Sequence, residues 1–513
     1  MVKRVALAGL LLALVPAIAD LARAQLGGKP IPSDEATKIL DQALAAANQA
    51  ADGEAKVAAL QTILRLEVHA GNSAEARRQT DALNKTDESR KYVMCEVAIA
   101  MALKGEGQKA LVMLDSDPDA EFGDWCYDQM GGAEAELGDV GGVVASGAFV
   151  RDGEPRAELY ASAAEAAFAS GKTDATEKLF ALARESAKTE EDANERILAL
   201  FHIAFAMIRF KDSKGAEALL PEMQAALPHV EKDERDMSLV AISQVQGGLG
   251  RFADAEQTIK SIHGDAPPEF ARSMMIRNLI ARGDLAEAIK NVQLIGPGSY
   301  KNASIEEIAA ERAHQGDFNG AFAMMPGVSD KFDIYNADSV YARIALEQAK
   351  HGKYEDARRT AHLLSEAKFR ARTLILLGSN MPKNDNDRAA DMFFSDARTA
   401  ALSIEIDFYR AAALSHLAGV LSARGKFAEA RAAADAIPSD AAEWVSGDVE
   451  KHKGSALGNI AYWQCKMGSC KEALEWSNKE GSPVLRGFAL AGVVQAMMGI
   501  GAPADHYYEE YYG

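Results

Sequence analysis

The chain repeats one pattern of apolar, small and polar positions along most of its length. In most copies a large apolar residue is followed three positions later by another apolar residue and four positions later by a small one. A glycine comes seven positions after the small residue, and an alanine five positions after the glycine. Because residues three and four apart share one face of a helix, each copy predicts an amphipathic helix, a glycine turn and a second helix. The clearest turns read GNSAEA at 71–76, GEGQKA at 105–110, GRFADA at 250–255, GDLAEA at 283–288, GDFNGA at 316–321, GKYEDA at 352–357, GKFAEA at 425–430 and GSCKEA at 468–473.

Weaker copies of the same phrase fill the intervals between these turns. They read GDVGGV at 138–143, GKTDAT at 171–176, KDSKGA at 211–216 and NDNDRA at 384–389, and a last turn follows at Gly499. Successive turns then lie about 31 to 43 residues apart, which is the period of stacked helical hairpins. The pattern therefore predicts an all-α protein built from a long array of helical hairpins.

The offsets of the small residue, the turn glycine and the alanine resemble those of the tetratricopeptide repeat (TPR) family, over roughly residues 50 to 500. The chain departs from the family where an aromatic residue is expected four positions before the glycine. Polar or apolar residues stand there instead: Met101, Glu134, Gln246, Arg312, Gln348 and Gln464. The resemblance implies an all-α, right-handed superhelical solenoid of antiparallel helix pairs, TPR-like, with about 12–13 hairpins. Another kind of helical hairpin array, or an α/α toroid, is the structural alternative.

The first 24 residues have the features of a secretory signal. Lys3 and Arg4 precede an apolar run at 6–19, and Ala22-Arg23-Ala24 offers an A-x-A cleavage pattern. The apolar run is short and interrupted by Pro16, which disfavours a membrane span. We therefore expect a signal peptide at 1–24, a repeat solenoid at 25–500 and an acidic tyrosine-rich tail at 501–513. The mature protein is expected in a bacterial periplasm, with secretion also possible; an uncleaved membrane anchor is the alternative.

The charge balance excludes some classes of partner. The formal net charge is −19, and the expected signal peptide carries three basic residues and one acidic one, so the mature protein is still more acidic. A strongly acidic surface repels nucleic acid and anionic lipid. We expect neither as a partner, and no membrane span after signal removal.

The sequence contains four cysteines, which can form disulfide bonds in an oxidising compartment. Cys465 and Cys470 lie on either side of the turn at Gly468. Cys95 and Cys126 fall in the first helices of neighbouring repeats, which stack side by side and allow a Cα separation of about 5.5 Å. Pairing Cys465 with Cys470 and Cys95 with Cys126 is the arrangement that does not tie opposite ends of the array together. Four reduced thiols are the alternative.

Motifs for chemistry are absent from the sequence. It contains no glycine-rich loop opening a helix after a strand, no Walker loop and no H-E-x-x-H pair. The C-x₄-C spacing lacks a second pair of ligands for zinc. We therefore expect no catalytic residue, no cofactor and no metal site.

In TPR-like arrays the first helix of each hairpin lines the concave face, where extended peptides lie. If the first helices of this chain line the concave face in the same way, they present basic side chains and aromatic rings to a partner: Arg209, Arg277, His314, Lys350, Phe201, Phe205 and Tyr462. They predict a face that receives an acidic or carboxylate-bearing segment. The alternative is that cations near helix ends only complement the helix dipole.

These features favour a non-enzymatic scaffold in the periplasm that binds a protein or peptide partner along the concave face. A cell-envelope glycan-active enzyme of helical-toroid type, or a permanent structural subunit of an envelope or secretion complex, is the alternative. The tail HYYEEYYG at 506–513 is either a docking segment or a last half-helix that covers the open apolar end of the array.

Overall fold

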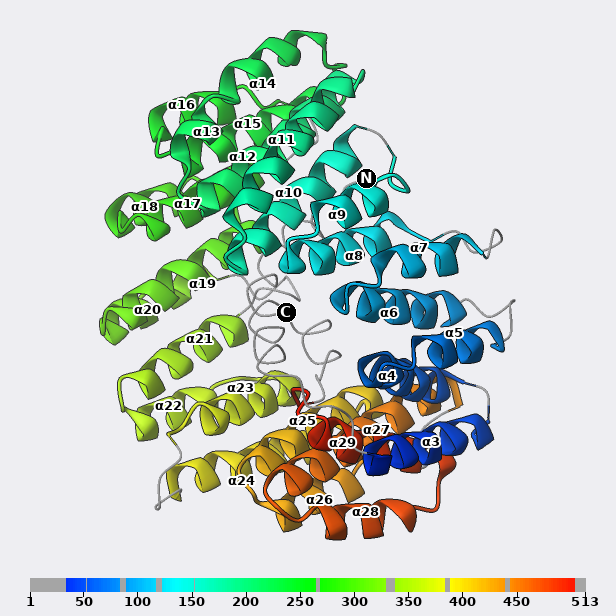
Figure 1. Ribbon diagram of the computed structural model, residues 1–513. Coiled ribbons are helices and arrows are strands. Elements are labelled where there is room, and N and C mark those ends of the chain that lie inside the picture. Colours follow the sequence, from blue (N-terminus) through cyan, green and yellow to red (C-terminus); the bar gives the residue numbers. More distant parts are fainter. Residues whose placement is uncertain are drawn as a thin grey trace. The chain divides into compact units, whose positions relative to one another are not determined.

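The computed structural model describes residues 34–51, 53–83, 89–116, 122–151, 153–263, 268–328, 337–382, 388–438 and 443–502 (Figure 1). Helices account for 79% of these residues, and none of them lies in a strand, so the all-α prediction is confirmed. The expected signal peptide at 1–24 and the tyrosine tail at 506–513 lie outside the described residues. No helix in the described ranges is both long and apolar enough to cross a membrane. The handedness of the array stays a prediction.

Internal contacts divide the chain into two units. The central unit is the continuous segment Gly105–Leu364. The terminal unit combines the chain up to Lys104 with the chain from Ser365 onward.

The central unit alternates first helices with shorter second helices. The first helices are α8 (Asp124–Leu137), α10 (Glu154–Ala169), α12 (Ala193–Arg209), α15 (Arg235–Gly248), α17 (Pro268–Ala281), α19 (Ser299–His314) and α21 (Ala337–Lys350). The second helices are α7 (Gly107–Asp115), α9 (Val140–Gly147), α11 (Thr173–Thr189), α13 (Ser213–Glu217) with α14 (Leu220–Ala226), α16 (Phe252–Ile259), α18 (Leu285–Val292), α20 (Phe318–Phe322) and α22 (Tyr354–Ala361), with short 3₁₀ turns η1 (Leu227–His229) and η2 (Met325–Gly327). From α8 to α21, each first helix packs against the second helix of its own hairpin, and from α8 to α19 each also packs against the next first helix. The result is the predicted two-layer array.

The turns between paired helices share one backbone geometry. At Gly171, φ is 72° and the amide donates to the carbonyl of Phe168, while the next amide, of Lys172, donates to Ala167. This pattern is a Schellman motif, which favours glycine because the turn residue is left-handed. Positive φ recurs at Gly71, Gly105, Gly138, Gly250, Gly283, Gly316, Gly352, Gly425, Gly468 and Gly499. Lys211 occupies the same place with φ 62°, the only non-glycine residue in the described ranges that does so.

The position four residues before the turn explains the missing aromatic. A polar side chain there reaches across the hairpin and accepts a hydrogen bond from a residue twelve positions later. The pairs are Glu134 with Ser146, Gln246 with Thr258, Gln348 with Thr360 and Gln464 with Trp476, each at 2.8 Å. A hairpin-spanning hydrogen bond therefore stands in these repeats where the TPR pattern has an aromatic contact.

The terminal unit contains the two ends of the array. Its helices are α3 (Asp34–Gln49), α4 (Glu54–Ala70), α5 (Ser73–Asp81), α6 (Ser89–Leu103), α23 (Ala367–Ser379), α24 (Arg388–Leu402), α25 (Asp407–Ala423), α26 (Phe427–Asp435), α27 (Glu443–Lys466), α28 (Cys470–Asn478) and α29 (Pro483–Met497). The N-terminal helix α3 packs along α29, and α4 packs against both α29 and α27 (Figure 1). Helix α3 thus lies where the second helix of the last hairpin would lie. Among the described residues, α3 and α4 pack against the buried face of α29.

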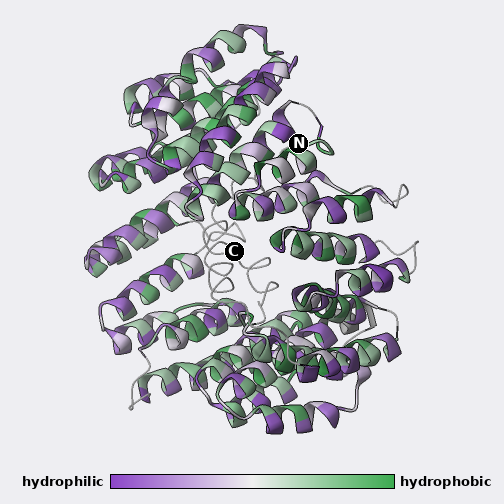
Figure 2. Cartoon of the chain, in the orientation of Figure 1, coloured by the Kyte–Doolittle hydropathy of each residue, from purple (hydrophilic) through white to green (hydrophobic). Residues whose placement is uncertain are grey.

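Small residues allow these helices to approach closely. On α29, a Cβ added at Gly487 would lie 3.5 Å from the carbonyl oxygen of Ala43 and 3.5 Å from the Cβ of Ala47, both on α3. On the other side of α29, a Cβ at Gly492 would lie 2.1 Å from the carbonyl oxygen of Gly458 on α27. Only glycine fits at Gly492. Figure 2 shows hydrophobic and hydrophilic residues interspersed along most helices, as amphipathic hairpins require.

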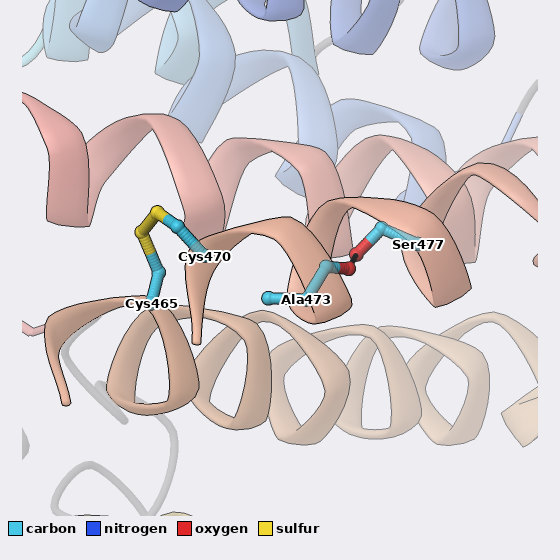
Figure 3. The surroundings of a disulfide bond; sticks show 4 residues. All are labelled: Cys465, Cys470, Ala473 and Ser477. Atoms are coloured by element: carbon cyan, nitrogen blue, oxygen red, sulfur yellow. Dashed lines mark hydrogen bonds between the residues drawn. A yellow bond between two sulfur atoms is a disulfide. The ribbon is translucent and has the colours of Figure 1, made fainter. Parts of the chain in front are cut away.

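The predicted Cys465–Cys470 disulfide is confirmed. It joins the end of α27 to the start of α28 across the turn at Gly468 (Figure 3). None of the four cysteines is free. Cys95 is buried on α6 of the terminal unit and Cys126 on α8 of the central unit. Because these two belong to different units, their pairing with each other stays a prediction.

Candidate functional site

The four basic residues predicted to bind a partner all lie on first helices of the central unit. Arg209 is on α12, Arg277 on α17, His314 on α19 and Lys350 on α21. Each contacts a carboxylate: Arg209 Nη1 lies 2.9 Å from Glu165 Oε2, Arg277 Nη2 lies 2.6 Å from Glu307 Oε1, His314 Nδ1 lies 3.2 Å from Glu347 Oε2, and Lys350 Nζ lies 2.6 Å from Glu347 Oε1. The predicted row of bases is therefore a row of acid–base pairs, three of which join neighbouring first helices.

Two of these pairs differ in their exposure to solvent. Arg209 is half-buried and Glu165 is buried, and burial raises the pKa of Glu165 against the opposing charge of Arg209. Arg277 and Lys350 are exposed. Hydrogen bonds from Lys350 and His314 outweigh burial and hold the pKa of Glu347 below its usual value. The pairs on α17, α19 and α21 are thus the ones that a partner can reach.

The predicted aromatic residues have two different environments. Phe201 and Phe205 are partly buried on α12, with ring centroids 5.5 Å apart, and the Phe201 ring lies 5.4 Å from that of His202. Tyr462 is on α27 and only 4% exposed, and its hydroxyl donates to the carbonyl of Ile500 at 3.1 Å. The placement of Tyr462 on a binding face was wrong, because the ring packs inside the terminal unit.

A cluster that the sequence did not predict lies on α8, α10 and α12. His202 on α12 has both ring nitrogens near carboxylates of α10: Nε2 is 3.2 Å from Glu154 Oε1, and Nδ1 is 3.7 Å from Glu158 Oε1. Glu154 and Glu158 are four residues apart and so share one helix face. Asp128 on α8 interacts electrostatically with Glu158 and His202. We call these four residues the His202 cluster.

The connection before α12 fixes the register of this cluster. The amide of Glu154 donates to Glu190 Oε2 at 3.3 Å, and Arg196 Nε donates to the carbonyl of Glu190 at 2.9 Å. Asp192 caps α12 by accepting from the amides of Asn194 and Glu195. Gly153 has φ 92°, which favours glycine, and a Cβ there would also displace the end of the Glu190 side chain. These contacts hold the start of α10 beside the start of α12.

The cluster perturbs the protonation of its members. Burial, with the charge of Glu158 adding to it, raises the pKa of Asp128 to about 7. Burial lowers the pKa of His202, but Glu158 and Glu154 outweigh this and raise it to about 9. Burial and the charge of Glu154 raise the pKa of Glu195 on α12. Carboxylates thus outnumber cations in this region, which is suited to hold a positive charge.

Comparisons with known proteins identify no relative for this chain: no family model and no curated protein matches it. Among solved structures it is similar to Ton1535 from Thermococcus onnurineus NA1, with 14% identity, 69% of this chain and 97% of that chain covered, and a TM-score of 0.26. It is similar to the pentatricopeptide repeat protein PPR10 from maize, with 13% identity, coverage of 88% and 68%, and a TM-score of 0.35. It is also similar to a circular tandem repeat protein, with 12% identity, coverage of 90% and 95%, and a TM-score of 0.13. Since all three TM-scores are low, the helical-repeat architecture rests on this chain's own helices and turns.

Proposed function

We propose that this protein is a non-enzymatic scaffold that binds a protein or peptide partner on the first helices of its central unit. The observation that carries this proposal is the row of exposed acid–base pairs on α17, α19 and α21. An exposed pair contributes only about 0.2–1 kcal/mol to stability. The partner's charged groups can therefore replace the internal ones at little cost, and several such exchanges along the row add up to a specific complex.

The partner segment that suits this row carries carboxylates. Arg277, His314 and Lys350 are exposed, whereas their partners Glu307 and Glu347 are partly buried. An incoming carboxylate reaches the basic groups first and competes with Glu307 and Glu347 for them. This supports the expectation that the partner presents an acidic or carboxylate-bearing segment.

Export to the periplasm is part of the same proposal. The disulfide Cys465–Cys470 is typical of proteins that fold in an oxidising compartment. The basic residues, apolar run and A-x-A pattern at 1–24 support it from the sequence.

A second candidate is a glycan-active enzyme, favoured by the His202 cluster. Glycoside hydrolysis needs one carboxylic acid with a raised pKa and a second, ionised carboxylate. Burial raises the pKa of Asp128 to about 7, and Glu158 is a second carboxylate in the same cluster. Release of sugar from cell-envelope glycan by the wild-type protein, lost in Asp128→Asn and Glu158→Gln variants, would favour the enzyme over the scaffold.

Charge reversal tests the scaffold. The triple variant Arg277→Glu, His314→Glu, Lys350→Glu places negative charges beside Glu307 and Glu347. It should weaken the binding of a partner purified from envelope extract by roughly tenfold to a hundredfold. Arg209 is left unchanged, because its reversal would leave the buried Glu165 without its ion-pair partner. Isothermal titration calorimetry gives the affinity, and circular dichroism checks that helix content is unchanged.

A matched control reverses three exposed bases associated with second helices of the same unit. Lys260, Lys290 and Arg359 are also exposed and each is paired with a nearby acid, so Lys260→Glu, Lys290→Glu, Arg359→Glu makes a comparable change in charge. The control should bind like the wild type. Equal weakening by both variants would mean that only net charge matters, and no weakening by either would place the partner elsewhere; both results contradict the proposal.

A further inference from the structure

The His202 cluster has the composition of a metal site. Glu154, Glu158 and His202 each offer one ligand atom, and these three atoms all lie within 4.8 Å of one another. Two of the side chains come from one turn of α10 and the third from the adjacent helix α12. No metal site was expected from the sequence, because no known metal motif is present and His202 lies 44 residues after Glu158, in another repeat.

Asp128 supplies a second, independent observation. Its Oδ1 atom is without exposed surface and accepts no hydrogen bond. Its Oδ2 atom has only a long contact, 3.4 Å, with the amide of the adjacent Gln129. A buried carboxylate oxygen without a partner is costly, and such groups in native proteins generally mark a bound ion, a water or a functional role. The charges of Glu158 and His202 act on Asp128, so this carboxylate lies near the three ligand-type residues.

The spacing suits a small divalent ion. The 3.2 Å separation of His202 Nε2 and Glu154 Oε1 is close to the distance between two ligands of one tetrahedral ion with bonds of about 2.0–2.2 Å. Glu158 Oε1 lies nearest the other ring nitrogen, 3.7 Å from Nδ1, so a change of rotamer of this 46% exposed side chain is needed to bring it to an ion on Nε2. A neutral imidazole with three carboxylates leaves an excess of negative charge that a divalent ion offsets.

The ligand types select the class of metal. An imidazole nitrogen favours zinc and other first-row transition metals, whereas Ca²⁺ and Mg²⁺ prefer sites made wholly of oxygen. We propose that Glu154, Glu158 and His202 bind one divalent transition-metal ion of the Zn²⁺ class, with the carboxylate of Asp128 nearby. Such an ion connects two consecutive first helices, α10 and α12, and holds them in register. This inference does not depend on the proposed partner-binding row, which lies on other helices.

Titration of the untagged mature protein with ZnCl₂ tests the site directly. After treatment with chelator and dialysis, isothermal titration calorimetry at pH 7.5 should show one Zn²⁺ bound per chain, and elemental analysis after gel filtration should give the same ratio. Glu158→Gln should weaken binding at least about tenfold, and His202→Ala should abolish it. Glu158→Gln keeps the size of a partly exposed side chain, so it tests the site even where His202→Ala impairs folding.

The control variant is His314→Ala. His314 also contacts a glutamate across neighbouring first helices, at 3.2 Å from Glu347, but without a second carboxylate on its other ring nitrogen in the described contacts. This variant should keep the one-to-one binding of the wild type. Absence of a stoichiometric Zn²⁺, or equal affinity in the wild type and Glu158→Gln, would overturn the proposal. Equal affinity for Ca²⁺ or Mg²⁺ would overturn the assignment to the transition metals.

Discussion

Two regions built from helical hairpins differ in the side chains they bring together. One is the interface of α3 with α29 in the terminal unit, and the other is the layer of first helices in the central unit. Helix α29 is buried along most of its length by small and aliphatic residues, and its glycines let α3 and α27 approach closely. The first helices α10 to α21 instead carry charged pairs, several of them exposed. The difference teaches that the same kind of hairpin serves either for close packing, as between α3 and α29, or for presenting charged groups on its first helix, as in the central unit.

The largest effect on stability is expected at the interface of α3 with α29. Leu40 on α3 is fully buried, so Leu40→Ala should reduce the free energy of unfolding by about 2–5 kcal/mol, the usual cost of a cavity in a packed core. Urea unfolding followed by circular dichroism measures it. Leu402→Ala, at an exposed leucine of the same unit, is the control and should change stability by no more than about 0.5 kcal/mol. A loss below about 1 kcal/mol for Leu40→Ala would show that α3 contributes little.

A second test concerns a buried acid at a hairpin-spanning position. Burial raises the pKa of Glu134 to about 7, and the hydrogen bond from Ser146 only partly opposes this. Since the folded pKa is above the unfolded one, near 4.5, the stabilisation is fully present below pH 4.5 and is lost as the pH rises through 7. Glu134→Gln, which copies Gln246 and Gln348, should therefore gain stability over the wild type as the pH rises from 5 to 8.

The size of this gain should be on the order of 2–3 kcal/mol at pH 8. Urea midpoints at pH 5, 6, 7 and 8 give the curve. Parallel curves for the variant and the wild type would mean that Glu134 titrates normally in the folded protein.

A smaller effect is expected at Lys211, where a described turn has lysine in place of glycine. Lys211 has the left-handed conformation that glycine adopts at the other turns, which costs a non-glycine residue about 1–2 kcal/mol. Lys211→Gly relieves this strain but loosens the unfolded chain, so we expect a net gain of about 0.5–1 kcal/mol. The converse change, Gly352→Ala, introduces no clash and should cost about 1 kcal/mol. Thermal melts of both variants should shift in opposite directions; a shift in the same direction would contradict the shared turn geometry.

The smallest effect is expected in the exposed pairs themselves. Arg277→Ala removes the contact with Glu307 and should lower stability by less than about 1 kcal/mol, like Lys290→Ala on α18. Urea unfolding at low and at high salt measures both. A loss above about 2 kcal/mol for Arg277→Ala would make the row a structural feature and weaken the case for partner binding.

The local part of the fold could be predicted from the sequence. The turn glycines, the weak copy at Lys211 and the Cys465–Cys470 bond are set by residues within a few positions of each other, so spacing alone identifies them. The polar residues before the turns, such as Gln246, could be seen as departures from the TPR pattern. Their bonding to residues twelve positions later needed the geometry of the hairpin.

The non-local part could not be predicted. The contact of α3 with α29 joins segments more than 400 residues apart, and the small residues Ala43 and Gly487 carry no signal for each other. The His202 cluster depends on the register of α10 and α12, which the contacts of Glu190 set and the length of the repeat does not reveal. Tyr462 has the position of a binding residue in the repeat, but it is buried and its hydroxyl donates to the carbonyl of Ile500.

Hydrogen exchange of the mature protein, followed by mass spectrometry, tests the interface of α3 with α29 most directly. If α3 completes the last hairpin, amides of α3 should exchange as slowly as those of α27 and α29, and Leu40→Ala should speed exchange in α3 and α29 together. Peptides from α17 to α21 should keep their wild-type rates in that variant. Rapid exchange in α3 of the wild type, with α29 unaffected by Leu40→Ala, would contradict the account.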